Sequence, residues 1–599
     1  MKKFILSVFF LISMILFAFT QNLTPTVVDI PMRDGNTLKA DIYLPDTINQ
    51  YPTILIQTPY SRLTARLGLP LGIGKNLSQS PYAFVVVDWR CFWGSAAACT
   101  ANPNRGEDGY DVVEWIATQT WSNGRIGTWG PSALGRIQFL TAKENPPSLD
   151  CIVPLVAGSQ TNYEEYFPGG VARTEYIAQL ENLGFGGSSI YYSNPVKNIV
   201  WDIVESGAFY PDEIHVPAMM IGGWYDHNVI VMMELFPAIQ SSSPPDVREN
   251  HRLLMGPWVH GGTGPAYVGS KVQGELEYPE AEKWSDSLAR VFLDHWLRDL
   301  YPEWNNSPKV QYFQMGENQW QAAPTWPPDG VLEQNFFLHP DQSIQSFPVS
   351  QSSGELSFSY DPQDPSPTDG GPTLSNDLTQ GPVDQRKKVE NRNDNLIFTS
   401  DPFQKPVRIQ GKPQLELMVS SDQPDTDFAV RLTDVYPDGR SMLLVDGIRR
   451  MRFRNGFRAT DTMVMNPGEM YSVSVEMPDL AHTFMPGHQM RVNITSSNYP
   501  RFNRNMNTGK EMYPNANGDT LVNPRVATNT VFLNAISPSK LILPVTDSVF
   551  TGIDQKLKNG FEARIIPNPT QGHSHIEFSD NLPGEIEITI YSMLGQKVW

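Results

Sequence analysis

The stretch that decides the fold is Gly127-Thr128-Trp129-Gly130-Pro131-Ser132-Ala133-Leu134-Gly135. It lies between a predicted strand, 125–129, and a predicted helix, 132–143. A serine on such a tight strand-to-helix turn is held above the sheet, and the neighbouring glycines leave room around its hydroxyl. The helix N-terminus then points the N–H of Ala133 at a developing oxyanion. A serine before a helix is just as often a simple N-cap, so this motif alone leaves both interpretations open.

Short apolar runs around this turn indicate a parallel sheet with helices on its faces. Continuous apolar runs are typical of strands buried on both faces, and they occur at Thr53–Gln57, Phe84–Asp88, Ala218–Ile221 and Arg252–Met255. Apolar residues at helical spacing occur at Tyr110–Gln119 and at about 281–299. This alternation of strands and helices predicts a doubly wound α/β fold.

Two further polar residues follow predicted strands directly. Asp226 comes after the apolar run that begins at Ala218, and His260 comes after the run that begins at Arg252. Because open α/β sheets carry their active crevice at the C-terminal ends of the strands, we expect Ser132, Asp226 and His260 to converge. Their chain order is that of α/β-hydrolases. A turn aspartate and a satisfied loop histidine are the alternatives, but the joint pattern favours a catalytic triad.

The triad chemistry gives each residue a role. His260 takes the proton of Ser132 and later gives it to the leaving group, while Asp226 fixes the imidazole tautomer. Tyr60 follows the strand Thr53–Gln57 and can reach the same crevice, although its spacing alone favours packing. The other candidate bases are weaker, because they adjoin Asp226, precede a strand or lie in a helix: His227, His251 and His295. We also predict that aromatic and proline neighbours of the triad bind substrate: Trp129, Pro131, Trp224 and Trp258.

Composition bounds the class of protein. The chain has 599 residues, with 40% hydrophobic and 18% charged residues, which is typical of large packed cores. Its formal charge of −19, without a basic patch, argues against binding to nucleic acid or to an anionic membrane. Neither Cys-x-x-Cys nor His-x-x-x-His spacing is present, so we expect no metal and no other cofactor.

The N-terminus has the pattern of a secretory signal peptide. Two lysines precede an apolar run, 4–17, and small residues follow it. The alternative is a membrane anchor, but the run is shorter than the roughly 20 residues that a spanning helix needs. Export allows a disulfide, and Cys91 and Cys99 are close enough in sequence to close a small loop. Cys151, in an apolar run, is then left as a buried thiol.

The second half of the chain changes from alternating strands and helices to strands alone. Strand-like runs separated by Gly, Pro, Asn and Asp recur from about residue 308, including 309–315, which predicts a jelly-roll β-sandwich. Residues 339–395 look like a long irregular connection. We predict a signal peptide (1–20), a first part of the α/β core (22–150), a helical cap (151–212), a second part of the core (213–303), a jelly roll (304–545), a linker (546–560) and a C-terminal segment (561–599).

At these residues the sequence resembles the cocaine esterase and X-prolyl dipeptidyl-peptidase family of serine hydrolases, the S15 or CocE/NonD type, which also holds α-amino-acid ester hydrolases. The matching motifs run in family order from about residue 25 to about 540: 59–62, 87–90, 107–111, 121–124, 129–135, 224–226, 256–260, 294–297, 315–320 and 434–439. The resemblance implies an α/β-hydrolase core with a helical cap and a jelly roll. It carries the triad onto Ser132, Asp226 and His260, and it makes Tyr60 the oxyanion donor beside the Ala133 N–H.

The chain departs from this family at three places. Ala133 stands where the family usually has tyrosine, and Cys91 stands where an Arg-Gly turn is usual. Family members that bind a substrate α-amino group have acidic residues just after the triad aspartate, whereas this chain has His227, Asn228 and Val229. This departure weakens the expectation of dipeptidyl or amino-acid ester specificity. A glutamate pair in the cap, 164–165, can supply negative charge, although two glutamates in a loop are usually solvated.

The C-terminal segment resembles the sorting domain of type IX secretion, in Pro567-Asn568-Pro569-Thr570 and in 591–596. The resemblance implies a Gram-negative bacterium, passage through the periplasm, and a secreted or cell-surface product that engages the type IX secretion machinery. The usual last strand of such domains is not reached at Trp599, so we expect a truncated end.

Together these patterns predict a serine hydrolase that cleaves small acyl esters or amides through a covalent acyl-enzyme. An X-Pro dipeptidyl-peptidase or α-amino-acid ester hydrolase is the nearer alternative. A surface binding protein with a catalytically silent core is the more remote one. The sequence leaves the oligomeric state open.

Overall fold

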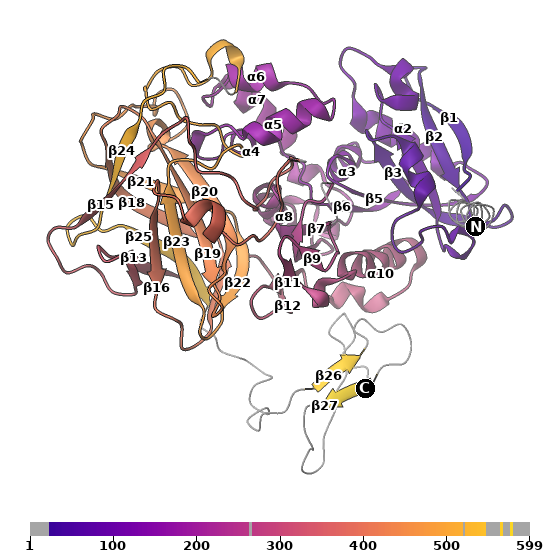
Figure 1. Ribbon diagram of the computed structural model, residues 1–599. Helices are drawn as coiled ribbons and strands as arrows, with labels where there is room; N and C mark the ends of the chain where they lie inside the picture. Colours follow the sequence, from indigo (N-terminus) through magenta and orange to yellow (C-terminus); the bar gives the residue numbers. More distant parts are fainter. Residues whose placement is uncertain are drawn as a thin grey trace, which may run out of the picture. The chain divides into compact units, whose positions relative to one another are not determined.

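The computed structural model describes residues 23–262, 266–375, 377–518, 521–546, 563–566 and 575–578, and the chain divides into two compact units (Figure 1). The first unit comprises Met1–Pro154, Glu213–Ala218 and Asp286–Pro302. The second comprises Leu155–Asp212, Met219–Ser285 and Glu303–Trp599. Among the described residues, no helix is both long and apolar enough to cross a membrane.

The predicted signal peptide and most of the predicted linker and C-terminal segment lie outside the described residues. From the C-terminal segment the structure describes two short strands, β26 (Ala563–Ile566) and β27 (His575–Phe578), which pair antiparallel.

The first unit contains one half of the expected α/β fold. Its strands run in the order β1-β2-β4-β3-β5, with the bounds Thr26–Pro31, Thr37–Tyr43, Ala83–Asp88, Tyr51–Thr58 and Ser122–Pro131. The first two strands form an antiparallel hairpin, whereas β3 is parallel to both β4 and β5. All six residues of β4 are buried, as the continuous apolar run predicts for a strand covered on both faces.

Helices pack closely on this sheet because small residues leave room for them. The helices are α2 (Arg105–Ala117), α3 (Ala133–Lys143) and α10 (Trp284–Arg298). A Cβ on Gly109 of α2 would lie 2.0 Å from the hydroxyl oxygen of Thr141 in α3, so the two helices touch there. A Cβ on Gly127 of β5 would lie 3.0 Å from Leu293 of α10. The core thus includes the strand that leads to the key serine.

The second unit contains the other strands of α/β type. Its strands β7 (Met219–Tyr225) and β8 (Arg252–Val259) are parallel, and every residue in both is buried. The long helix α8 (Val229–Ser242) follows β7. Strand β11 (Val310–Gln314) is parallel to β8, and β12 (Gln319–Ala323) closes the edge antiparallel to β11.

This pairing corrects the predicted start of the jelly roll at residue 304. Val310 lies opposite Leu253 of β8, so the run 309–315 belongs with the α/β strands rather than with the sandwich. Its apolar pattern identified a strand correctly, but a pattern cannot tell which sheet a strand will join.

The cap helices begin later than predicted. Residues 151–155 belong to the buried strand β6 (Leu149–Leu155), and Ile152 forms a parallel bridge with Ala218. The helices follow as α4 (Tyr163–Tyr166), α5 (Thr174–Asn182), α6 (Ser188–Ser193) and α7 (Ile199–Ala208). They pack around an aromatic cluster that includes Tyr163, Phe167 and Trp201. The short buried run at Cys151-Ile152-Val153 was the sequence signal for the strand.

The rest of the second unit is the predicted β-rich domain, drawn in orange to yellow in Figure 1. Its main strand path is β15-β24-β18-β25-β13-β14-β16-β23-β19-β20, and β17, β21 and β22 pair at its side. The bounds are β13 (Val331–Leu338), β14 (Ser343–Gln345), β15 (Glu355–Tyr360), β16 (Leu396–Ser400), β17 (Val407–Gly411), β18 (Gln414–Ser421), β19 (Asp427–Val435), β20 (Ser441–Arg450), β21 (Tyr471–Glu476), β22 (Leu480–Phe484), β23 (Gln489–Thr495), β24 (Ala527–Phe532) and β25 (Lys540–Thr546). Two of these, β14 and β15, lie inside the predicted irregular connection 339–395. They are short or mostly exposed, which is why their apolar signal was weak.

Candidate active site

Ser132 lies at the junction of β5 and α3 with a strained backbone. Its φ is 59° and its ψ is −123°, a conformation that non-glycine residues adopt rarely and at a cost of about 1–3 kcal/mol. Ser132 occupies the N-cap position, but its side chain makes no capping hydrogen bond. Its carbonyl instead accepts the N–H groups of Gly135 and Arg136 at 2.8 and 2.9 Å. The simple N-cap alternative is therefore wrong for this side chain.

The glycine before the serine is required by close packing. Gly130 has a φ of 157°, and a Cβ there would lie 2.5 Å from the Cβ of Leu134. Leu134 occupies the position that is glycine in the common elbow motif, and its side chain covers Gly130. Ala133 is the first residue of α3, so its N–H has no acceptor within the helix and is available to an anion.

Tyr60 is the hydrogen-bond partner of Ser132 in the first unit. Its hydroxyl and the Ser132 side chain are hydrogen bonded, and burial raises the pKa of the Tyr60 phenol, which keeps it protonated at neutral pH. The backbone N–H of Tyr60 donates to the Thr58 hydroxyl at 3.0 Å, and that of Arg62 donates to Asp88 at 2.7 Å. The structure thus places the phenol beside the serine.

Asp226 and His260 form a buried pair in the second unit. Asp226 follows β7 and is 0% exposed, and His260 follows β8 and is 9% exposed. His260 Nδ1 lies 2.7 Å from Asp226 Oδ1. Because an ionised carboxylate can only accept, Nδ1 carries the proton and Nε2 is left as the basic nitrogen. The pair therefore has the arrangement of a general base oriented by a carboxylate.

The sequence-predicted residues thus come together in two groups. Ser132, Ala133 and Tyr60 lie in the first unit, and Asp226 and His260 lie in the second. Each group lies at the C-terminal ends of parallel strands, as predicted.

His227, the weaker candidate base next to Asp226 in sequence, lies beside His260. Its ring centroid lies 4.3 Å from that of His260. The ring centroid of Tyr176, from α5, lies 5.0 Å from that of His227. No periodicity or motif connects Tyr176 with the triad, because only the cap fold brings it there.

The cap also places charged side chains behind Tyr176. Glu165 is 6% exposed and accepts the Tyr176 hydroxyl at 2.8 Å, so it is a buried residue of α4 rather than a solvated loop residue as expected. The Arg173 guanidinium lies 4.2 Å from the centre of the Tyr176 ring and donates to the Glu165 carbonyl at 3.0 Å. Burial raises the pKa of nearby Glu175, which lies 3.9 Å from Arg173.

One group of metal-ligating types occurs in the described part of the chain. Potential ligand atoms of Asp226, His227 and His260 all lie within 4.8 Å of one another. Imidazole and carboxylate suit transition metals such as Zn²⁺. Coordination through Nδ1 of His260 would have to replace its 2.7 Å hydrogen bond to Asp226.

Two of the predicted substrate-binding residues are core residues instead. Trp224 is 3% exposed, donates to the Phe313 carbonyl at 2.8 Å and lies 5.0 Å from Trp326. Trp258 is 0% exposed and packs against Trp320. Both predictions are wrong, because side chains in β7 and β8 point into cores on both faces. Trp129 and Pro131 are partly exposed, and their binding role stays a prediction.

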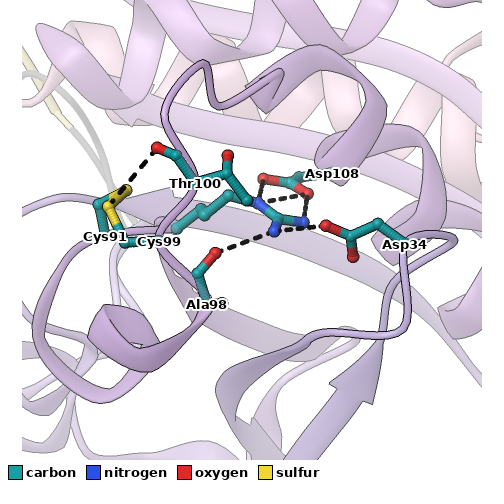
Figure 2. The surroundings of a disulfide bond; sticks show 7 residues. Asp34, Cys91, Ala98, Cys99, Thr100 and Asp108 are labelled. Carbon is teal, nitrogen blue, oxygen red and sulfur yellow. Dashed lines mark hydrogen bonds and ion pairs between the residues drawn. A yellow bond between two sulfur atoms is a disulfide. The ribbon is translucent and has the colours of Figure 1, made fainter.

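The cysteines are arranged in the first unit as the sequence suggested. Cys91 and Cys99 form a disulfide, and Cys151 is a buried thiol. Figure 2 shows that the disulfide adjoins Ala98, whose carbonyl accepts the Arg90 guanidinium at 2.9 Å. Arg90 also binds Asp108 of α2, so the disulfide loop is fixed to a helix of the core.

The fold and these groups define an α/β-hydrolase-like serine hydrolase with a β-rich C-terminal domain. Comparison with known families agrees. Residues 34–203 match the X-Pro dipeptidyl-peptidase (S15 family), and residues 302–542 match the X-Pro dipeptidyl-peptidase C-terminal non-catalytic domain. The two matches together span more than half of the chain, which belongs to this family of serine hydrolases.

Individual proteins are similar to the chain in sequence, and solved structures are similar to it in fold. The chain is 27% identical to a cocaine esterase of Rhodococcus sp. (strain MB1 Bresler) over 576 residues, covering 86% of this chain and 98% of the relative. It is 23% identical to a putative Xaa-Pro dipeptidyl-peptidase of Bacillus cereus, and the match covers 69% of this chain and 66% of the relative. Among solved structures, an α-amino acid ester hydrolase matches with a TM-score of 0.75 at 24% identity, covering 87% of this chain and 96% of that one. An aminopeptidase from a marine sediment Thaumarchaeota archaeon also matches with a TM-score of 0.75. The two chains are 22% identical, and the match covers 88% of this chain and 97% of that one.

Proposed function

We propose that this chain is a secreted hydrolase that cleaves acyl esters or amides with Ser132, His260 and Asp226 as a catalytic triad. The observation that carries the proposal is the buried 2.7 Å hydrogen bond between His260 and Asp226. A buried carboxylate that holds one imidazole nitrogen leaves the other as a base. Ser132 supports the same role, because its backbone on the turn between β5 and α3 is strained and its side chain does not cap the helix. Such strain persists at functional sites.

The chemistry follows from these groups. Ser132 Oγ attacks the carbonyl carbon while its proton passes to His260 Nε2, and Asp226 stabilises the resulting imidazolium. The tetrahedral intermediate then collapses, the bond to the leaving group breaks, and the imidazolium gives its proton to the leaving oxygen or nitrogen. Water, deprotonated by His260, attacks the acyl-enzyme in the same way. The carboxylic acid leaves and the Ser132 hydroxyl is restored.

The oxyanion is held by two donors of the first unit. The Tyr60 hydroxyl already binds the Ser132 side chain, and the Ala133 N–H is unpaired within its helix. Donors that are fixed before the reaction stabilise the developing charge without reorganising, and loss of one typically costs about 100- to 1,000-fold in kcat.

Esters with uncharged acyl groups are the preferred substrates. Recognition of a substrate ammonium group needs a carboxylate that is not already paired. Glu165 is engaged by Tyr176, and the Arg173 guanidinium lies against the same ring. Glu175, the other buried carboxylate here, lies 3.9 Å from Arg173, so neither glutamate is left unpaired for an α-ammonium group beside His227. Small-molecule or peptide substrates are consistent with the family, and the nearer alternative remains dipeptide release or amino-acid ester hydrolysis.

A labelling experiment tests the proposal. The purified protein is treated with a fluorophosphonate probe, and its turnover of p-nitrophenyl acyl esters is measured. Ser132→Ala should abolish labelling and reduce kcat/KM by about 10⁴-fold or more. Ser148→Ala is the matched control, because its hydroxyl binds Glu114 at 3.2 Å in the same unit and has no catalytic role. A well-folded protein that neither labels nor turns over esters would favour the surface-binding alternative.

A substrate comparison separates the esterase from the peptidase. Rates for p-nitrophenyl acyl esters are compared with those for Xaa-Pro anilides on the same preparation. We expect faster ester turnover because Glu165 and Glu175 of the cap are already paired with Tyr176 and Arg173. Faster turnover of the anilides would show that the enzyme is a dipeptidyl-peptidase.

Secretion is the remaining part of the proposal. The Cys91–Cys99 disulfide supports an oxidising destination, since such bonds are rare in the cytosol. Fractionation of a Gram-negative host, with N-terminal sequencing of the mature protein, tests it. Cleavage near residue 20 and recovery outside the inner membrane are expected. An uncleaved cytosolic product would contradict it.

A further inference from the structure

Trp93 is an exposed tryptophan that makes one specific hydrogen bond. It is 64% exposed and begins the 3₁₀ helix η3 (Trp93–Ala98), which lies inside the loop closed by Cys91 and Cys99. Its indole Nε1 donates to the carbonyl oxygen of Pro59 at 2.7 Å. Pro59 directly precedes Tyr60, so this bond is made to the peptide group that joins the two.

Both ends of that peptide group are held by side chains. Trp93 binds its carbonyl oxygen, and the Thr58 hydroxyl accepts its N–H at 3.0 Å. Because a peptide group is planar, fixing the oxygen and the N–H fixes the position of the Tyr60 Cα as well. The ring of Pro59 restricts φ on the other side. From that fixed Cα, only the backbone φ and the side-chain torsions of Tyr60 remain to place its phenol.

The loop that carries Trp93 is anchored to the same strand end as the Tyr60 segment. Gly94 donates to Asp88 Oδ2 at 3.0 Å, and the Ser95 hydroxyl donates to the Asp88 carbonyl at 2.9 Å. Asp88 also accepts the N–H of Arg62 at 2.7 Å, on the far side of Tyr60. A Cβ on Gly94 would lie 2.5 Å from the Arg62 guanidinium, so the loop and the segment are in tight contact.

The backbone of the loop is not in an ordinary conformation. Cys91 has a φ of 75° and Trp93 a φ of 42°, both in the region that favours glycine. Strained backbone is kept where the surroundings over-determine it. Here the disulfide, Asp88 and Arg90 do so, and the result is that the indole N–H points at Pro59.

We propose that Trp93 is a positioning residue for the reaction: its indole N–H holds the Pro59–Tyr60 peptide so that the Tyr60 phenol meets the oxyanion. This inference rests on the proposed function, in which Tyr60 is an oxyanion donor. Trp93 acts through Tyr60 and does not itself contact the reacting atoms. Its loss should therefore weaken binding of the transition state and leave binding of the substrate unchanged.

Trp93→Phe removes the N–H and keeps an aromatic ring. We expect kcat for p-nitrophenyl esters to fall about tenfold, less than for outright loss of an oxyanion donor, with KM changed less than about twofold. Inhibition by phenylboronic acid, which forms a tetrahedral adduct on the serine, should weaken by a similar factor. Trp320→Phe is the matched control, because its indole donates to a backbone carbonyl, that of Glu280, at 2.9 Å in the second unit.

A double-mutant cycle separates positioning from general damage. In a Tyr60→Phe background, Trp93→Phe should cost nothing further in kcat, because the donor that it positions is gone. The midpoint of thermal unfolding shows whether both variants are folded. Independent, multiplying effects of the two substitutions would overturn the inference, and so would a change in KM instead of kcat.

The outcome also distinguishes this inference from the proposed function. An active wild-type enzyme whose kcat is unchanged by Trp93→Phe would overturn the inference alone. A wild-type enzyme that does not turn over esters and does not label at Ser132 would overturn the proposed function together with it.

Discussion

The two halves of the candidate site are held in place in different ways. The nucleophile half, around Ser132 and Tyr60, is built from strained backbone and from side chains that bind peptide groups. The acid–base half, Asp226 and His260, is a buried hydrogen-bonded pair between two strands without exposed residues. The nucleophile half depends on turns that loop side chains hold in place, and the acid–base half depends on how closely two strands approach. The difference teaches that the two groups of the candidate site are held by two different kinds of contact.

The largest expected effect tests whether the two halves act as one catalytic unit. Asp226→Asn should lower kcat by about 10⁴-fold at neutral pH, because the amide allows the wrong imidazole tautomer. In a Ser132→Ala background the same change should have almost no further effect on the residual rate. Steady-state kinetics on p-nitrophenyl esters measure both. Multiplying losses would show that Ser132 and Asp226 do not work together.

The next effect concerns the strand contact under the acid–base half. A Cβ on Gly223 of β7 would lie 2.1 Å from the carbonyl oxygen of Trp258, which is backbone and cannot turn away. Gly223→Ala should therefore lower the free energy of unfolding by about 3 kcal/mol, as other overpacked cores do. Urea denaturation measures it. Gly207→Ala, in α7 with no atom within 4 Å of the new Cβ, should be neutral or stabilising by up to about 1 kcal/mol. Equal effects of the two changes would contradict the close approach of β7 and β8.

Removal of the disulfide tests, through the free energy of unfolding, how the loop beside the nucleophile half is held. Cys91 and Cys99 are 8 positions apart, and chain entropy predicts about 2–3 kcal/mol of stability for so short a loop. Replacing both by serine should lower the free energy of unfolding by that amount. A thiol reductant should destabilise the wild type but leave the double variant unchanged. A wild type that is indifferent to reductant would mean that Asp88 and Arg90 suffice to hold the loop.

A buried histidine gives the second unit a pH dependence. Burial, and next the charge of Arg252, lowers the pKa of His251 from 6.5 to about 3. Between about pH 6.5 and pH 3, His251 binds a proton in the unfolded chain but not in the folded chain. The free energy of unfolding therefore decreases as the pH is lowered through this range. At pH 5 the free energy of unfolding is therefore lower by about 2 kcal/mol than at pH 7.5.

Replacement of His251 should remove this acid sensitivity. The difference in unfolding free energy between pH 7.5 and pH 5 should be smaller by about 2 kcal/mol in His251→Gln than in wild type. His215→Gln, at an exposed position, is the control and should keep the wild-type difference. An unchanged pH dependence in His251→Gln would show that other groups cause it.

Sequence patterns predicted where strands lie and where they end, but they did not predict what the side chains of those strands contact. The apolar runs located β4, β7 and β8, and the polar residues that follow two of them are Asp226 and His260. The same patterns misplaced Trp224 and Trp258, which precede the candidate catalytic residues in sequence but are buried in the core. When both faces of a strand are buried, closeness in sequence to a site residue does not indicate whether a side chain contacts the site or the core.

The amino-acid sequence by itself determined the class of fold, the family, and the two short turns that carry Ser132 and Asp226. Apolar periodicity and glycine positions are local, so they can be read along the chain. Only the tertiary structure decided that Tyr176 contacts His227, that β11 joins β8, and that Trp93 binds Pro59. These contacts join residues far apart in sequence or depend on one rotamer of a loop side chain, and neither leaves a periodic trace.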